Sequence, residues 1–151
     1  MEVDYVSLNQ PDREGRIIVP HTLVWTGLRW HVRGWCEKNQ DYRDFVLSRF
    51  RGEPEVLDTS DKTGASDEDW HTLVTIEIAP DTRLTADQQA VVAHDYGMTD
   101  AKWQLSVRAK LLPYLLQLLR LDPTQLMEDP RAQQIVIENQ SDIEAWLFPS
   151  R

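Results

Sequence analysis

The sequence is short of cysteine and of long apolar runs. Its single cysteine, Cys36, cannot form a disulfide within the chain, and no cluster of Cys and His has the spacing of a metal site. No apolar run approaches the ~20 residues that span a bilayer, and the acidic start at residues 1–4 has no apolar segment of a signal peptide. These absences predict a cytoplasmic protein with no metal, no cofactor and no membrane partner.

Recognisable catalytic motifs are also missing. The chain contains no Gly-x-Ser-x-Gly, no phosphate-binding loop and no metal-binding helix. His71 and His94 are isolated, and we interpret both as structural or surface residues. A cluster of His and Arg could serve a nuclease, but no carboxylate pair or nucleophile accompanies it. The sequence therefore predicts a protein that is not an enzyme.

Positive charge is scarce in the second part of the chain. The net charge is −9, and it is unevenly placed: residues 1–51 hold 8 basic and 7 acidic residues, whereas residues 52–151 hold 8 and 18. With 41% hydrophobic and 27% charged residues, the composition is that of a globular protein. The asymmetry predicts two units with different roles. The acidic unit would repel a nucleic acid duplex, and the near-neutral one could hold a local basic site.

One short run in the first part alternates basic or polar residues with large apolar ones. Arg29, His31 and Arg33 share one parity, and Trp30 and Val32 share the other. In a β-strand successive side chains point to opposite faces. The run therefore predicts a strand with one cationic face and one apolar face. A purely structural strand seldom needs three cation-capable groups on one side, so this stretch points to a function.

Short extended segments separated by turn residues surround this strand. They are expected at residues 3–7, 16–19, 22–25, 28–36 and 43–49. Pro20 is expected to end the second segment or to lie at its edge. Strands at this close spacing predict a small antiparallel β-barrel with Trp30, Val32 and Val46 in its core. Cys36 is expected to be a small buried hydrophobe.

A linker and a second domain follow the barrel. Gly, Pro, Asp and Ser dominate residues 51–69, so we place a linker at 61–69 between domains at 1–60 and 70–151. Thr85 and Gln88 form a capping-box pattern. The expected strands lie at 71–78, 103–107 and 135–137, and the expected helices at 86–96, 111–121 and 142–147. This order describes a small α/β layer domain, and the whole chain is then of the α+β class.

Three blocks of the first domain resemble a WYL domain in order and spacing. They lie at residues 16–21, 27–33 and 42–50. Trp30-His31-Val32 stands where the family has its Trp-Tyr-Leu motif. Residues 95–98 and the predicted helix at 111–121 resemble the C-terminal extension that often follows WYL domains.

The resemblance implies a Sm-like or SH3-like β-barrel that binds a ligand, and an extension that dimerises. We therefore expect a homodimer formed through residues 70–151. Such proteins are typically bacterial transcriptional regulators, including regulators of phage-defence systems. They usually carry an N-terminal winged helix-turn-helix, whereas this sequence starts at the barrel. Either the sequence is truncated or the DNA-reading part lies elsewhere, so duplex DNA would be bound only through a region outside this chain.

Basic side chains on the barrel strands form the candidate site. Arginine matches phosphate or carboxylate with a planar fork of donors, although salt bridges to Glu37, Asp41 and Asp44 on the surface are the alternative. For a set spread over neighbouring strands we favour an anion pocket. Tyr5 and Ser7 could add a stacking ring and a hydroxyl, or be a core tyrosine and a surface serine. The predicted ligand-binding residues are Tyr5, Ser7, His21, His31, Arg33, Arg43 and Arg49, with Arg29 ranked lower because it enters its strand from a turn.

The tryptophans allow two interpretations. Trp25, Trp30 and Trp35 could form a platform for stacking bases or pack in the barrel core, and for Trp30 we favour the core.

We therefore predict a ligand-sensing regulatory module that binds an anionic effector, either a nucleotide or a short single-stranded nucleic acid. One alternative is a Sm-like RNA-binding module, which would bind RNA in a salt-sensitive manner. The other is a small nucleotide hydrolase.

Overall fold

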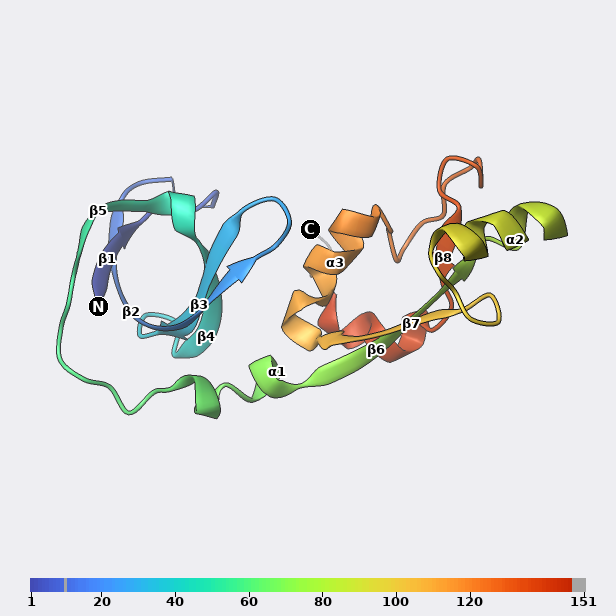
Figure 1. Ribbon diagram of the computed structural model, residues 1–151. Coiled ribbons are helices and arrows are strands. Elements are labelled where there is room, and N and C mark those ends of the chain that lie inside the picture. Colours follow the sequence, from blue (N-terminus) through green and yellow to red (C-terminus); the bar gives the residue numbers. More distant parts are fainter. Residues whose placement is uncertain (10, 148–151) are drawn as a thin grey trace. The chain divides into compact units, whose positions relative to one another are not determined.

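Five strands form one antiparallel sheet in the first of the two units into which the chain divides, Met1–Glu68 and Asp69–Arg151 (Figure 1). The computed structural model describes residues 1–9 and 11–147. The strands pair in the order β4-β3-β2-β1-β5. They are β1 (Glu2–Tyr5), β2 (Glu14–Trp25), β3 (Trp30–Cys36), β4 (Asp41–Val46) and β5 (Phe50–Glu55).

The sheet curls strongly, but its ladder of hydrogen bonds is open. Each neighbouring pair is antiparallel, and β4 and β5 are the two edges of the sheet among the strands that the structure describes. The predicted mixture of helices with antiparallel strands is confirmed. The predicted closure into a Sm-like or SH3-like β-barrel is not confirmed.

The strand β2 runs through Pro20, which we expected to interrupt it. The register between β2 and β3 shifts between Pro20 and Thr22, so a bulge lies at the point where proline has no N–H to donate. Gly34 lies opposite Pro20 and lets the two backbones approach closely. A Cβ at this position would be 2.6 Å from the carbonyl oxygen of Val19.

The segment after Val46 also differs from the expectation. The strand predicted to reach residue 49 ends at Val46 and continues as a 3-10 turn, η1 (Leu47–Arg49). Residues 51–55, which we assigned to the start of a linker-like stretch, belong to β5, which pairs with β1. Glu, Arg and Pro residues are typical of an exposed edge strand as well as of a linker, so composition alone could not separate the two.

The core of this unit lies between the curled strands. Tyr5 and Phe45 pack edge to face, with ring centroids 5.3 Å apart. Cys36 is fully buried, as expected. Trp30, by contrast, is 48% exposed, so the prediction that it belongs to the core is wrong. The buried core residues are Val3, Tyr5, Ile18, Val32, Cys36 and Phe45.

The second unit has the predicted alternation of strands and helices. Its sheet has the order β7-β6-β8, with both pairs antiparallel. Thr85 caps α2 through the predicted capping box with Gln88. The regular elements are α1 (Glu68–His71), β6 (Leu73–Pro80), α2 (Ala86–Asp95), β7 (Trp103–Arg108), α3 (Leu112–Leu119), β8 (Ile135–Ile137) and α4 (Gln140–Ile143).

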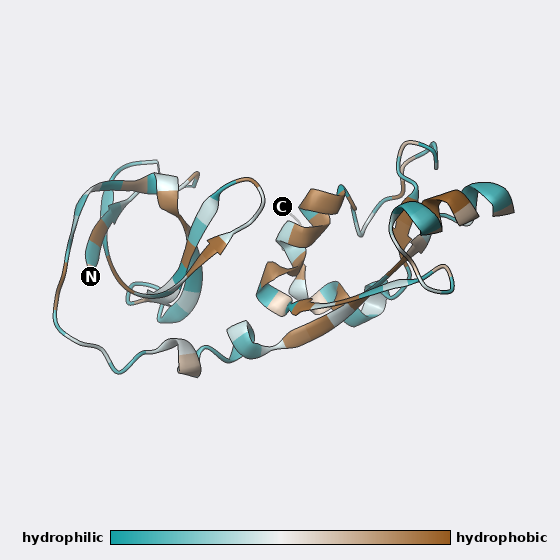
Figure 2. Ribbon diagram, viewed as in Figure 1, coloured by the Kyte–Doolittle hydropathy of each residue, from teal (hydrophilic) through white to brown (hydrophobic). Residues whose placement is uncertain are grey.

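Apolar residues of β6 and α3 supply four of the nine buried residues of the second core, and Figure 2 shows brown along both elements. Ile76, Ile78, Leu112, Ile135 and Ile143 are almost completely buried. Each unit therefore has a hydrophobic core of its own. Within residues 1–9 and 11–147, no helix has the length and apolar character needed to cross a bilayer.

Candidate anion-binding site

The strand β3 is buried on both of its faces. His31 is 4% exposed and Arg33 is 2% exposed, while Val32 on the opposite face is 6% exposed. The predicted cationic face is therefore present but does not face solvent. A buried arginine needs a carboxylate or another anion beside it, because an uncompensated charge in the interior is very costly.

Arg33 finds that carboxylate in Asp67, which is itself 1% exposed. Its Nε donates to Asp67 Oδ2 at 2.8 Å and its Nη2 donates to Asp67 Oδ1 at 2.9 Å, a two-pronged contact. Its Nη1 lies 3.3 Å from Asp44 Oδ1 on β4. Burial alone would lower the pKa of Arg33, but the two carboxylates outweigh burial and the pKa is raised. The guanidinium is thus firmly charged.

His21, on β2, contacts the same carboxylate. Its Nε2 lies 2.9 Å from Asp67 Oδ2, and its Nδ1 lies 2.7 Å from Thr22 Oγ1. Because a carboxylate only accepts hydrogen bonds, the Nε2 proton points at Asp67. We call the group formed by Arg33 and His21 around this carboxylate the anion site. Two of the predicted ligand-binding residues are therefore brought together, and they already hold an anion supplied by the chain.

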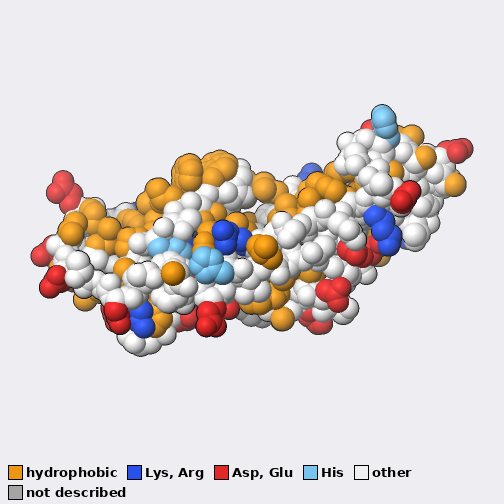
Figure 3. All heavy atoms as spheres, turned by 60° about the horizontal axis from the view of Figure 1, so that its bottom comes forward, with side chains coloured by type: hydrophobic (Ala, Val, Ile, Leu, Met, Phe, Trp, Pro, Cys, Tyr) orange, Lys and Arg blue, Asp and Glu red, His pale blue; other side chains and the backbone are white. Residues whose placement is uncertain are grey.

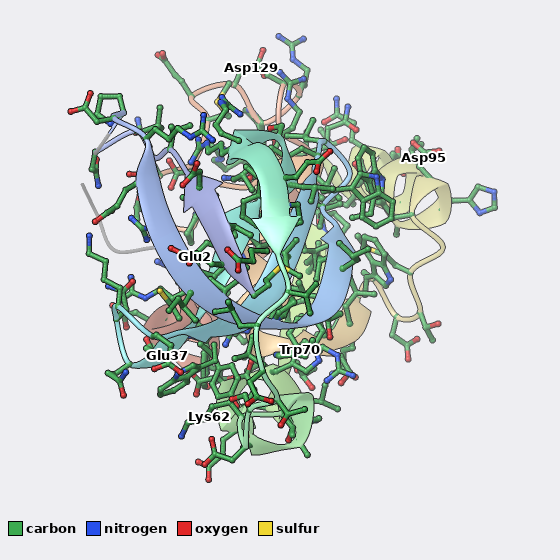
Figure 4. All side chains as sticks on the ribbon, turned by 90° about the vertical axis from the view of Figure 1, so that its left-hand side faces the viewer. Glu2, Glu37, Lys62, Trp70, Asp95 and Asp129 are labelled. Atoms are coloured by element: carbon green, nitrogen blue, oxygen red, sulfur yellow. The ribbon has the colours of Figure 1, made fainter. Side chains whose placement is uncertain are left out.

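Asp67 ends a short stretch, residues 62–67, that lies against β3 and β4; we call it the docked segment. Lys62 Nζ is 4.4 Å from the centre of the Trp35 ring, and Figure 4 labels Lys62 below the curled sheet. The Tyr42 hydroxyl donates to the Thr63 carbonyl oxygen at 2.7 Å and lies 2.6 Å from Ser66 Oγ. Among these contacts, the ones at Asp67 are the most deeply buried.

His31 is also buried, but unlike Arg33 it is not held in its charged form. Burial lowers its pKa, and the positive charges of Arg29 and Arg49 lower it further, while Asp44 opposes them. The imidazole is thus biased towards its neutral form near neutral pH. We expected His31 to contribute a charge to the pocket. In the structure it is a buried side chain of β3.

The other predicted site residues lie apart from the anion site or have a structural role. The Arg43 side chain is 52% exposed and lies 3.8 Å from Asp41, the surface salt bridge that was the alternative interpretation. Arg49 is half-buried in η1, and Ser7 is half-buried just after β1. Tyr5 is a core residue whose hydroxyl accepts a hydrogen bond from Val46 N at 3.0 Å.

Sequence reasoning missed Asp67 altogether. It lies in the stretch of Asp, Ser, Thr and Gly that we interpreted as a linker, and nothing in the residues around it marks it as buried. The only available signal was indirect. If Arg33 is buried in a strand, some carboxylate must cover it, but the pattern does not say which one.

An apolar cavity adjoins the anion site through His21. Its volume is about 510 Å³, and its wall includes Val3, Ile18, Val32 and Phe50, with His21 and Arg51 among the polar contributors. A second, smaller hollow of about 320 Å³ lies at the tip of the β2–β3 hairpin, lined by Trp25, Arg29, Trp30, Leu47 and Ser48. The Trp25 and Trp30 rings are 5.4 Å apart, and both side chains are about half exposed.

Family models match both units. The WYL domain matches residues 1–53, and the C-terminal dimerization domain of the BrxR transcriptional regulator matches residues 73–143. The chain therefore matches a WYL domain followed by a dimerization domain of the BrxR type. The family expected from the sequence is confirmed.

The curated relatives are all named DNA-binding transcriptional repressor CapW. The protein from Stenotrophomonas maltophilia is 34% identical over 100% of this chain and 50% of its own length. Those from Escherichia coli (strain KTE188) and Pseudomonas aeruginosa are each 35% identical over 97% and 95% of this chain. The chain thus spans about half the length of the curated relatives it matches.

Among solved structures, proteasome accessory factor B/C of Arthrobacter aurescens matches 99% of this chain and 25% of its own, at 17% identity. The TM-score is 0.34, which is too low to relate the two folds in detail.

Proposed function

We propose that this chain is the effector-sensing and dimerising part of a transcriptional repressor. The proposal is supported by the order of its two domains and by relatives that are named DNA-binding transcriptional repressors. Because the similarity covers about half of those relatives, the proposal assigns DNA reading to a region outside these 151 residues.

The effector in this proposal is an anion, and the observation that carries it is the anion site. Arg33 and His21 converge on a carboxylate with three polar contacts of 2.8 to 2.9 Å. The same fork of donors fits a phosphate oxygen pair. Acidic side chains are scattered over the face drawn in Figure 3, in keeping with a net charge of −9. An anionic ligand is therefore attracted only where basic groups gather locally.

A nucleotide or a short single strand is the anion that best fits the surroundings. The apolar cavity beside His21 can take a base or sugar while the phosphate lies against the basic side chains. The exposed Trp25 and Trp30 rings, with Arg29 beside them, offer a further surface on which a base can stack. An Sm-like RNA-binding module would use the same surfaces, so the test includes RNA.

Calorimetric titration of the full chain tests the proposal. Adenosine and thymidine monophosphates, hexathymidylate, hexauridylate and a duplex are titrated in turn. We expect one of the nucleotides or single strands to bind and the duplex not to bind.

Replacing His21 with alanine should weaken that binding about tenfold, the scale of a hydrogen bond to a charged group. The matched control is Arg83→Ala in the second unit, because Arg83 also holds a buried carboxylate, that of Asp81, at 2.7 Å. The control should bind as the unmodified chain does. If no nucleotide or single strand binds at millimolar concentration, the effector assignment is wrong.

A further inference from the structure

The anion site is occupied by a side chain of the protein itself. Asp67 makes the same kind of contacts with Arg33 and His21 that a phosphate would make. With Asp67 in place, the Arg33 side chain is 3% exposed to solvent. A ligand anion can reach this fork of donors only if Asp67 moves away.

We propose that Asp67 is the resting occupant of the anion site and that the anionic effector displaces it, which releases the docked segment from the sheet. This inference rests on the proposed function and adds to it the mechanism by which binding is detected. The effector in this inference is a phosphate-bearing nucleotide or oligonucleotide. The segment that moves is residues 62–67.

The docked segment is held in a way that permits release. Asp67 is the only buried residue of the segment, and the contacts of the others include the Lys62–Trp35 contact, the hydrogen bonds of Tyr42 and the packing of Gly64 beside the His21 ring. No large apolar side chain of residues 62–67 is anchored in the core, so release withdraws no apolar anchor from it.

Charge makes the release depend on an incoming anion. If Asp67 left on its own, the buried guanidinium of Arg33 would lose its two-pronged partner and retain the longer contact to Asp44, at 3.3 Å. A phosphate arriving as Asp67 leaves keeps the positive charge compensated throughout. The closed form is therefore stable without ligand, and a neutral ligand gains nothing by opening it.

Because Asp67 lies close to the boundary between the two units, its release affects the connection between them. Asp67 lies next to the boundary between the two units, which falls between Glu68 and Asp69, and α1 begins at Glu68. When Asp67 is held, the connection to the dimerisation unit starts at a fixed point on the sheet. When Asp67 is released, residues 62–67 are no longer held on the sheet and become part of the connection between the units. Ligand binding in one unit is thereby linked to the freedom of the other.

The first test uses the unmodified full chain and needs no variant. Trypsin cleaves after Lys62, which is now held against Trp35. Hexathymidylate with a 5′-phosphate is the probe, and pyrophosphate is the small-anion comparison. We expect the probe to accelerate cleavage after Lys62 about tenfold, while cleavage at basic residues of the second unit keeps its rate.

The second test measures the affinity of the probe for two variants. Asp67→Asn removes the competing charge and should bind the probe about tenfold more tightly, within the usual range of coupling between sites. Tyr42→Phe leaves the anion site intact but removes the hydroxyl that holds Thr63 and Ser66, so it should tighten binding about fivefold. Asp69→Asn is the matched control, since Asp69 pairs with Lys110 in the second unit, and its affinity should not change.

The outcomes separate this inference from the proposed function. If the probe binds but neither variant binds it more tightly, and cleavage after Lys62 is unaffected, Asp67 is a fixed structural partner of Arg33 and the displacement is wrong. If the probe binds to none of the proteins, including Asp67→Asn, the effector assignment itself fails and the displacement fails with it. Should Asp67→Asn not fold, Tyr42→Phe and the cleavage experiment still decide the question.

Discussion

At the scale of single residues, two of the predicted ligand-binding groups of the first unit are also structural groups. Arg33 bridges Asp67 and Asp44, and His21 joins the same cluster, so each charge is compensated inside the fold. A side chain of this kind cannot be removed without consequences for stability. The affinity of a variant in this cluster is therefore interpreted together with a measurement of its stability.

The first prediction concerns Arg33. Replacing Arg33 with alanine leaves Asp67 buried without its main partner, so the free energy of unfolding should fall by roughly 3–5 kcal/mol. Urea denaturation followed by fluorescence measures this loss. Arg43→Ala is the control, because the Arg43 side chain is 52% exposed, and it should cost no more than about 0.5 kcal/mol. Equal, small losses in both variants would contradict the buried ion pair.

A second prediction concerns His31 and pH. Burial, with the charges of Arg29 and Arg49, lowers the pKa of His31 below 6.5, and Asp44 opposes the shift only in part. Just below pH 6.5 the unfolded chain thus binds a proton that the folded protein does not, so stability falls as the pH falls through this window. Above it, the stability is fully retained.

Melting temperatures measured between pH 7.5 and 5 test this dependence, a range chosen around the usual titration of histidine at about 6.5. His31→Gln cannot titrate and should lose stability less steeply on acidification. His94→Gln, at an exposed position on α2, should keep the slope of the unmodified chain. Identical slopes in all three proteins would show that His31 does not cause the effect.

At the scale of elements, the passage of β2 through Pro20 depends on one residue of the facing strand. A Cβ at Gly34 would lie 2.6 Å from the Val19 carbonyl oxygen and 2.8 Å from Pro20 Cα. Both are backbone atoms, which cannot move aside as the end of a side chain can. The close approach of the two strands at the bulge therefore requires glycine.

We accordingly predict that Gly34→Ala destabilises the first unit by about 1–3 kcal/mol, the usual cost of forcing extra atoms into a packed site. Urea denaturation gives the value. Gly15→Ala is the comparison, because its Cβ would meet the flexible Glu2 side chain at 3.3 Å, and the change should be close to neutral. If the two variants are equally stable, β2 and β3 adjust more readily than their spacing indicates.

Local patterns were sufficient for some elements and insufficient for others. Alternation revealed β3 and β6, and the Thr85–Gln88 pattern revealed the start of α2, because each of these signals is contained in a few neighbouring residues. The continuity of β2 through Pro20 depends on the facing strand β3, and the pairing of β5 depends on β1, at the other end of the first unit. Composition could not reveal either of them.

Part of the candidate site could likewise be predicted from local sequence, and part of it could not. His21 and Arg33 were predicted as ligand-binding residues from their basic character, and they do converge. Both side chains are covered by Asp67, whose carboxylate lies between them and which is 34 residues from Arg33 along the chain. No periodicity connects residues across such a distance, so the occupant of the site could not be predicted.

At the scale of the whole molecule, each unit has its own core, and the dimerization model falls on the second. We predict that the full chain sediments as a dimer at roughly tens of micromolar, a range in which moderate interfaces associate. A fragment of residues 69–151 should also dimerise, whereas residues 1–68 alone should be monomeric. A monomeric full chain, or a dimeric first unit, would place the interface elsewhere.

The exposed edge of the first sheet bears on how copies of the chain meet. β5 ends in Glu53, Pro54 and Glu55, which puts two negative charges and a residue without an N–H along a row of backbone groups. A strand from a neighbouring molecule would meet repulsion and a gap in the ladder there. The addition of further strands at this edge, which is the first step towards a fibril, is thereby opposed. Association of two copies through this edge of the sheet is thereby disfavoured.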